Sequence, residues 1–240
     1  MNLTEPELKV INTEMESLSA EERIAWAWDR FGAGLVLSTS FGLQSSVMLD
    51  LVLKVSKEIP VIFVDTGYLF AETYQYALTI QERFGFRVRT YSAKMSPAFQ
   101  EVVFGKLWDQ GTDEMKRYNF INKKEPMERA LNELGATAWL SGLRRSQSKD
   151  RGKRPFIESQ DQVVKFYPIL DWDDRQTYKY IPNNDIPYHP LEGMGYDSVG
   201  DHHSTNKIDP TQAAEDSRHG GHGRECGLHL DLPEGLDFSV

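Results

Sequence analysis

The feature that most constrains the fold of this chain is a series of short, mostly apolar runs, separated from one another by helix-like segments. Runs of strand length stand at residues 35–37, 60–64, 87–91, 137–140 and 163–167. Continuous apolar runs are typical of strands that are covered on both faces of a sheet. Helices are expected at 4–17, 19–31, 47–55, 70–84, 123–134 and from about 172 to before Pro182, with shorter pieces around 100–105 and 211–218. The alternation predicts an α/β fold with a twisted, mainly parallel sheet covered by helices.

Two local signals support the expected helix starts. Ser19 and Glu22 have the spacing of a capping box, in which each residue satisfies a free backbone N–H of the other. Pro126 follows Lys123-Lys124-Glu125, where the first turn of a helix tolerates proline.

The length and polarity of the chain bound its class. A chain of 240 residues fits one large α/β domain or two small ones, and either can bury a substantial core. The first thirty residues are polar and acidic, and no apolar stretch approaches the roughly 18 residues of a membrane span. We therefore expect a cytoplasmic protein.

The charge is unevenly distributed. With 27 basic and 36 acidic residues, the net charge of −9 argues against nucleic-acid binding. The segment 144–154 (RRSQSKDRGKR) nevertheless carries six basic residues and one aspartate. It is either a solvated loop or a confined site for a small, highly charged anion.

Polar turns follow three of the expected strands. They are residues 38–46 (STSFGLQSS), 65–68 (DTGY) and 141–143 (SGL), the last leading into the basic segment. The carboxyl ends of parallel strands share one sheet edge, where ligands of such folds bind. The first turn has the hydroxyl groups and the following helix of an anion site, but not the Gly-Lys-Ser/Thr ending of a Walker loop. Its serines are also compatible with a simple helix N-cap, and Asp65 with a turn residue.

The single cysteine, Cys226, stands in the motif Arg224-Glu225-Cys226-Gly227-Leu228-His229. One cysteine excludes an intramolecular disulfide, a zinc site built on several thiolates and a four-cysteine iron–sulfur cluster. A neighbouring arginine favours the thiolate, so Cys226 is either a nucleophile or an inert buried residue. His189, His202 and His203 lack metal-site spacing and are expected to be polar loop residues, so no metal site is expected. The glycine- and histidine-rich segment 219–223 is typical of a hinge.

Seven motifs resemble, in the same order, those of thioredoxin-dependent phosphoadenylyl-sulfate (PAPS) reductases. They are STSFGLQ (38–44), VDTGYLFAETY (64–74), NKKEPM (122–127), SGLRRSQS (141–148), YPILDWDDR (167–175), YDSVGDHHST (196–205) and RECGLH (224–229). The resemblance covers nearly the whole chain, and ECGLH is its most specific part. It implies one domain over residues 1–240 with an adenine nucleotide alpha hydrolase-like fold, in which residues from about 200 to 240 form a mobile tail carrying the cysteine.

The resemblance also implies a mechanism. Cys226 would attack the sulfur of the sulfate group and form a thiosulfonate, from which thioredoxin or glutaredoxin releases sulfite. No redox cofactor would be bound, and the protein would be a homodimer. The implied substrate-binding residues are Ser38, Thr39, Ser40, Phe41, Gly42, Asp65, Thr66, Gly67, Lys123, Arg144, Arg145, Arg151, Arg218 and His229. Among these, Lys123, Arg218 and His229 would serve the phosphosulfate, and the 144–154 loop the phosphates.

Three alternatives stay open. Related adenylyl-sulfate (APS) reductases usually carry cysteine pairs for an iron–sulfur cluster, but residues 118–124 and 200–205 contain no cysteine, so a cluster-free APS reductase is one alternative. An ATP pyrophosphatase or adenylyltransferase is the second, although it would be expected to have an SGGxDS motif. A non-catalytic nucleotide-binding protein is the third, and it would leave the Cys226 motif without a role. The chain departs from the family at Asn206 and in segment 219–223, where the related enzymes often have arginine and bulkier residues.

Overall fold

A six-stranded sheet forms the centre of the computed structural model, which describes residues 3–160 and 163–208. The strand order is β3-β2-β1-β4-β6-β5, and every neighbouring pair is parallel except β5 and β6. The strands are β1 (Leu35–Thr39), β2 (Val61–Asp65), β3 (Arg89–Ser92), β4 (Ala138–Leu140), β5 (Ile157–Gln160) and β6 (Val163–Phe166). The predicted α/β class and the mainly parallel sheet are confirmed.

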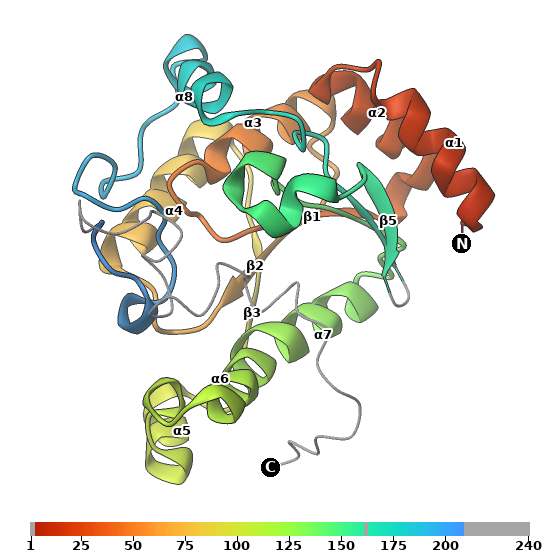
Figure 1. Cartoon of the computed structure of the whole chain (residues 1–240). Coiled ribbons are helices and arrows are strands. Elements are labelled where there is room, and N and C mark those ends of the chain that lie inside the picture. The colour runs from red at the N-terminus through yellow and green to blue at the C-terminus, as the bar shows by residue number, and fades with distance from the viewer. Residues whose placement is uncertain (1–2, 161–162, 209–240) are drawn as a thin grey trace.

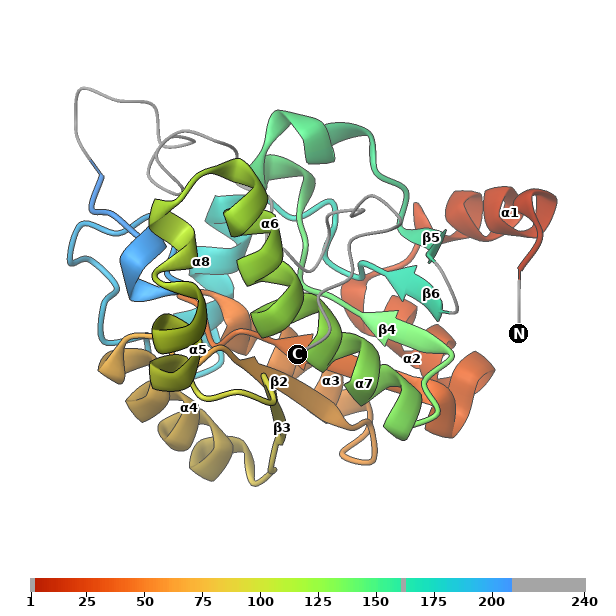
Figure 2. The ribbon, with the colours of Figure 1, turned by 90° about the horizontal axis from the view of Figure 1, so that it is seen from below.

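Helices cover both faces of the sheet (Figure 1). One face carries α1 (Glu5–Met15), α2 (Ala20–Phe31), α3 (Ser45–Val55), α4 (Ala71–Phe84) and α8 (Asp174–Asn183). The other carries α6 (Thr112–Asn119) and α7 (Glu125–Glu133), with α5 (Pro97–Phe104) beside them; Figure 2 shows these three in front of the sheet. The predicted capping box is present, since Glu22 N–H donates to Ser19 Oγ at 3.2 Å and Ser19 N–H to Glu22 Oε2 at 2.7 Å.

The strands are buried on both faces because successive side chains point to opposite helix layers. Val36 and Ile62 pack with Met127 of α7, whereas Leu35 and Leu37 belong to the larger core under α2 and α3. This two-sided burial explains why the strands are recognisable as continuous apolar runs.

The site position follows from the strand order. From β1 the chain moves through β2 and β3 to one edge of the sheet, and then through β4 and β6 to the other side of β1. The order therefore reverses between β1 and β4. In open α/β sheets, ligands bind in the crevice outside the carboxyl ends of the strands at such a point.

Three elements differ from the sequence prediction. The antiparallel edge strand β5 was not expected, because three of its four residues are polar and only Ile157 is buried. Helix α6 was not predicted either, and it continues through a π-helix, η3 (Phe120–Lys124), directly into α7. Pro126 lacks the N–H that an α-helix would direct at Asn122, and the turn before it instead uses an i→i−5 bond from Glu125 N–H to Phe120 O.

The prediction that α8 ends before Pro182 was wrong, since the helix runs to Asn183. Pro182 lies in the last turn, where the loss of one backbone bond is tolerated because the helix ends directly after it. Within residues 3–160 and 163–208, no helix combines the length and apolarity that a membrane span requires. The helix predicted at 211–218 lies outside the described residues.

Candidate functional site

A cavity of about 360 Å³ opens at the carboxyl ends of β1, β2 and β4, at the predicted switch point. Its wall is formed by the turn after β1, Thr66 after β2, residues 141–144 after β4, and the loop 197–201. Lys123 from η3 and Arg151 from the 3₁₀ segment η5 (Lys149–Lys153) add cations. The three predicted polar turns thus contribute to one cavity.

The turn after β1 presents its polar groups to this cavity. Ser38, Thr39, Ser40 and Gly42 line it, and Ser38 Oγ accepts a bond from the Trp139 indole N–H at 2.7 Å. Helix α3 begins directly afterwards, so the positive end of its dipole faces the same region. Hydroxyl groups beside a helix N-terminus suit an anionic ligand.

Phe41 supports this turn from behind. Its side chain is fully buried and makes an edge contact with Phe63, with ring centroids 5.1 Å apart. Its φ is +49°, a left-handed conformation that costs a non-glycine residue about 1–2 kcal/mol. The buried ring anchors this strained backbone, so Phe41 shapes the turn although its side chain lies outside the cavity.

Lys123 adds a buried cation to the cavity wall. Its Nζ lies 2.8 Å from Asp201 Oδ2 and 5.3 Å from the centroid of the Tyr118 ring. Burial alone would raise the pKa of Asp201, but the Lys123 ammonium and the hydroxyl of Thr66 hold the pKa of Asp201 well below its ordinary value. The ion pair between Lys123 and Asp201 is therefore the stable arrangement in this part of the cavity wall.

Arg144 is a second buried cation of the cavity wall and is held by three partners. Its guanidinium donates to Asp174 Oδ1 at 2.8 Å and to Thr177 Oγ1 at 3.0 Å, both on α8, and also to the side-chain oxygen of Gln44. Arg151 lies nearby and donates to Gln147 Oε1 at 2.5 Å. Both arginines line the cavity, so the basic segment delivers a concentrated positive charge there.

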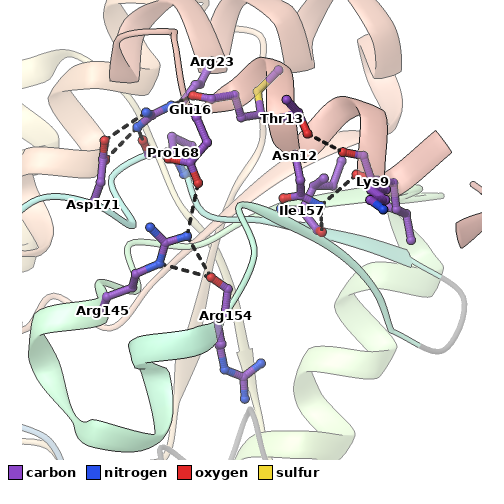
Figure 3. A network of polar contacts seen from close by, with 12 residues as sticks. Lys9, Asn12, Thr13, Glu16, Arg23, Arg145, Arg154, Ile157, Pro168 and Asp171 are labelled. Carbon is purple, nitrogen blue, oxygen red and sulfur yellow. Dashed lines mark hydrogen bonds and ion pairs between the residues drawn. The ribbon is translucent and has the colours of Figure 1, made fainter. Parts of the chain in front are cut away.

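Arg145, in contrast, lies outside the cavity although it follows Arg144 directly. Figure 3 shows its guanidinium turned toward the carbonyl of Arg154 and toward Glu16; the distance to that carbonyl is 3.0 Å and to Glu16 Oε1 3.7 Å. It also lies 5.1 Å from the Phe156 ring centroid. These contacts join the basic segment to the N-terminal helices.

The residues of the turn after β2 also differ in whether they line the cavity. Thr66 lines the cavity, whereas Asp65 and Gly67 do not. Asp65 Oδ1 instead accepts bonds from Gly67 N–H at 2.8 Å and from Tyr74 Oη at 2.6 Å, and burial together with this carboxylate raises the pKa of Tyr74. Asp65 therefore orders the turn in the role of a turn residue.

The structure adds residues to those predicted. Asp201, Gln44, Gln147 and Ser141 line the cavity, as do Asp174, Thr177 and Tyr178 of α8. The apolar residues of the wall include Leu37, Met48 and Ile169. Gln44, Gln147, Ser141, Asp174 and Asp201 stand inside motifs that carry the family resemblance, which is the signal that would have found them.

Three predicted residues, Arg218, Cys226 and His229, lie outside the described residues. Among the residues that are described, no group of three or more histidine, cysteine or acidic side chains is placed to hold a metal ion. Within this part of the chain, the ligand-binding chemistry of the cavity rests on hydroxyl groups, backbone N–H groups and cations.

Comparisons with known proteins place this geometry in context. A model of the phosphoadenosine phosphosulfate reductase domain matches residues 34–207. The phosphoadenosine 5′-phosphosulfate reductase of Pectobacterium atrosepticum is 49% identical over 222 residues, covering 92% of this chain and 91% of the relative. The Vibrio cholerae protein of the same name is 48% identical, covering 93% and 88%.

Solved structures agree with the fold. The phosphate complex of Candida auris PAPS reductase superimposes with a TM-score of 0.76 at 31% identity, over 87% of this chain and 99% of that one. Candida glabrata FMN adenylyltransferase superimposes with a TM-score of 0.60 over 97% and 80%, at only 13% identity, and so shares the fold alone. The adenine nucleotide alpha hydrolase-like architecture predicted from the sequence is confirmed.

Proposed function

Since this chain belongs to the phosphoadenosine phosphosulfate reductase family, we propose that it reduces PAPS to sulfite and adenosine 3′,5′-bisphosphate through Cys226. The observation that carries this proposal is the cavity between β1 and β4, where a hydroxyl-lined turn meets Lys123, Arg144 and Arg151. A nucleotide with several anionic groups matches that distribution of donors and cations.

The reaction begins with the Cys226 thiolate. Its sulfur attacks the sulfur of the sulfate group, and the bond from that sulfur to the phosphate oxygen breaks. The leaving group is adenosine 3′,5′-bisphosphate, and the enzyme keeps a Cys226 thiosulfonate. No electron has yet been supplied from outside.

Thioredoxin or glutaredoxin completes the reduction. One of its thiolates attacks Cys226 Sγ, releases sulfite and forms a mixed disulfide. Its second thiol then frees the Cys226 thiolate, so the donor ends as a disulfide and the substrate sulfur has gained two electrons. A single cysteine in this chain is sufficient for that cycle, which needs neither a bound redox cofactor nor an iron–sulfur cluster.

Cations are needed because an anion attacks an anion. We assign Lys123, together with Arg218 and His229 of the C-terminal segment, to the sulfate end of the substrate, where they would offset this repulsion. Arg144 and Arg151 are assigned to the phosphates, including the 3′-phosphate that distinguishes PAPS from APS. The apolar wall of Leu37, Met48 and Ile169 suits the purine.

The wider setting is part of the same proposal. A free thiol that must be regenerated by thioredoxin fits a reducing compartment, so we place the protein in the cytoplasm. We also propose a homodimer, and a C-terminal segment that brings Cys226 to the cavity and withdraws to meet the electron donor.

Turnover with matched substrates tests this function. Sulfite release is measured with PAPS or APS in the presence of reduced thioredoxin, using wild type and Cys226→Ser. We expect sulfite from PAPS with the wild type, none with the variant, and unchanged binding of adenosine 3′,5′-bisphosphate in both. Release from APS at an equal rate would instead indicate a cluster-free APS reductase, and unaltered turnover by Cys226→Ser would exclude the thiosulfonate route.

A further inference from the structure

Asp201 is a buried carboxylate in the wall of the cavity, next to Lys123. Its side chain is 1% exposed, and each of its two oxygens faces a polar partner. Oδ2 lies 2.8 Å from Lys123 Nζ, and Oδ1 accepts a bond from Thr66 Oγ1 at 2.5 Å. Asp201 and Lys123 both line the cavity, so this pair belongs to the surface that a ligand would meet.

The backbone around Asp201 is fixed on several sides. Asp201 forms an isolated antiparallel bridge with Leu69, and His202 N–H donates to Tyr68 O at 2.8 Å. The Thr205 hydroxyl donates to the Asp201 carbonyl at 2.9 Å. The carboxylate therefore cannot follow a moving partner, and the flexible four-carbon stem of Lys123 is the part of the pair that can adjust.

Because Lys123 is buried, its ammonium depends on a counter-ion. Lys123 is 9% exposed, and a buried ammonium without a counter-ion loses its proton far more readily than one in water. The titratable groups that act on Asp201 besides Lys123 are Tyr68 from the turn before α4, Tyr74 from α4, Tyr118 from α6 and His203 from the 3₁₀ turn η6 (His202–Ser204). None of these four is a carboxylate, so among these described neighbours Asp201 supplies the negative charge that stabilises the ammonium.

We propose that Asp201 is a positioning residue for the reaction, which keeps Lys123 charged and directs its ammonium to the place where the sulfate group binds. This inference rests on the proposed function, because Lys123 acts on the sulfate only in that account. In this role Asp201 needs no contact with a reacting atom. It acts through Lys123, which makes it separable by experiment from a residue that merely holds the loop 197–205 in place.

The pH dependence of Asp201→Asn is the first test. The amide keeps the size of the side chain but removes the negative charge that lies 2.8 Å from Lys123 Nζ, so the buried ammonium loses its counter-ion. We expect kcat/KM for sulfite release to fall about tenfold near pH 8, and the ratio of variant to wild type to rise steadily toward pH 6. Asp185→Asn, which removes an exposed carboxylate paired with Arg83, is the matched control and should give a ratio near one throughout.

A double-mutant cycle with Lys123→Gln is the second test. If Asp201 acts through Lys123, then Asp201→Asn should change kcat/KM by less than about twofold once Lys123 is already glutamine. The double variant also removes both buried charges together, so it folds even where Asp201→Asn leaves an ammonium unpaired and unstable. The proposal would be overturned by a further tenfold loss of kcat/KM when Asp201→Asn is added to Lys123→Gln. It would also be overturned if the ratio of kcat/KM between Asp201→Asn and the wild type did not change with pH.

Binding of adenosine 3′,5′-bisphosphate, measured by calorimetry on the same variants, separates this proposal from the proposed function. The 5′-phosphate of this nucleotide would lie next to Lys123, so its affinity for Asp201→Asn relative to wild type should also rise as the pH falls. If the wild type releases no sulfite from PAPS but this trend appears, the proposed function fails, and Asp201 is left with the role of keeping Lys123 charged for binding the nucleotide. If sulfite is released and the affinity ratio does not change with pH, the proposed function stands and the role of Asp201 fails.

Discussion

The arginines of the basic segment have different surroundings, although their positions in the sequence do not distinguish them. Arg144 and Arg151 face the cavity, whereas Arg145 binds the Arg154 carbonyl and packs near Phe156. The sequence predicted that this segment reaches the strand ends, because the apolar run of β4 leads directly into it. Which arginine faces inward is decided by the short 3₁₀ turn η4 (Arg145–Gln147), which has no periodic signature.

A pair of substitutions tests this division. Arg151→Gln should weaken binding of adenosine 3′,5′-bisphosphate about tenfold, because one cation at the cavity is lost. Arg145→Gln removes the same charge from the same segment and should change the affinity by less than about twofold. Calorimetric titration of both variants gives the comparison. Equal losses of affinity would show that nucleotide binding depends on the total charge of the segment and not on which arginine faces the cavity.

At the scale of elements, the sequence predicted strands that are buried without interruption and helices whose burial follows a regular period. The strands β1, β2 and β4 are of the first kind, and the helices α2 to α4 are of the second. The polar turns after these three strands also predicted the edge at which the cavity lies. Helix α6 was missed because it is polar and buries only Tyr118 and Asn119. Asp201 was missed for another reason: a loop aspartate is usually solvated, and its burial here depends on Lys123 and Thr66, which are distant in sequence.

The loop after α8 gives a pH prediction at this scale. His189 attaches this loop to α4, with its Nε2 3.2 Å from Thr73 Oγ1, and its Nδ1 accepts a bond from Leu191 N–H at 3.1 Å. Burial lowers the pKa of His189 from 6.5 to about 4, against a weaker opposing effect of Glu72. Between these two values only the unfolded chain binds the proton, so the free energy of unfolding must decrease as the pH falls through this window.

The free energy of unfolding is expected to decrease by about 3 kcal/mol at most between pH 7 and pH 4. Urea unfolding of wild type and His189→Asn at several pH values isolates it, because all other titrating groups are shared. The asparagine keeps an acceptor for Leu191 N–H but does not titrate. The wild type should therefore lose more stability on acidification than the variant, and parallel pH curves would contradict the buried, neutral histidine.

For the whole molecule, the order of the strands explains why residues far apart in the chain act together. The reversal between β1 and β4 opens the cavity, and the last described segment, 197–208, passes over it through Asp201 before the chain continues toward Cys226. The length of segment 209–225 allows the cysteine to return to this cavity. The account therefore depends on Cys226 reaching a ligand bound between β1 and β4.

Alkylation of Cys226 tests that arrangement without turnover. We expect iodoacetamide to react with Cys226 faster than with a model thiol at neutral pH, since Arg224 favours the thiolate. Adenosine 3′,5′-bisphosphate should slow the reaction in the wild type. In Arg151→Gln the same protection should require about tenfold more nucleotide. Protection that is absent in the wild type would separate the cysteine from the cavity.

The most direct measurement is the mass of the intact protein after reduced enzyme is mixed with PAPS in the absence of thioredoxin. The account predicts one sulfonate group added to Cys226, formed together with one adenosine 3′,5′-bisphosphate and released as sulfite when reduced thioredoxin is added. Cys226→Ser should gain no mass under the same conditions. A wild-type protein that binds PAPS yet gains no mass would contradict the thiosulfonate intermediate and leave the cavity as a nucleotide-binding site only.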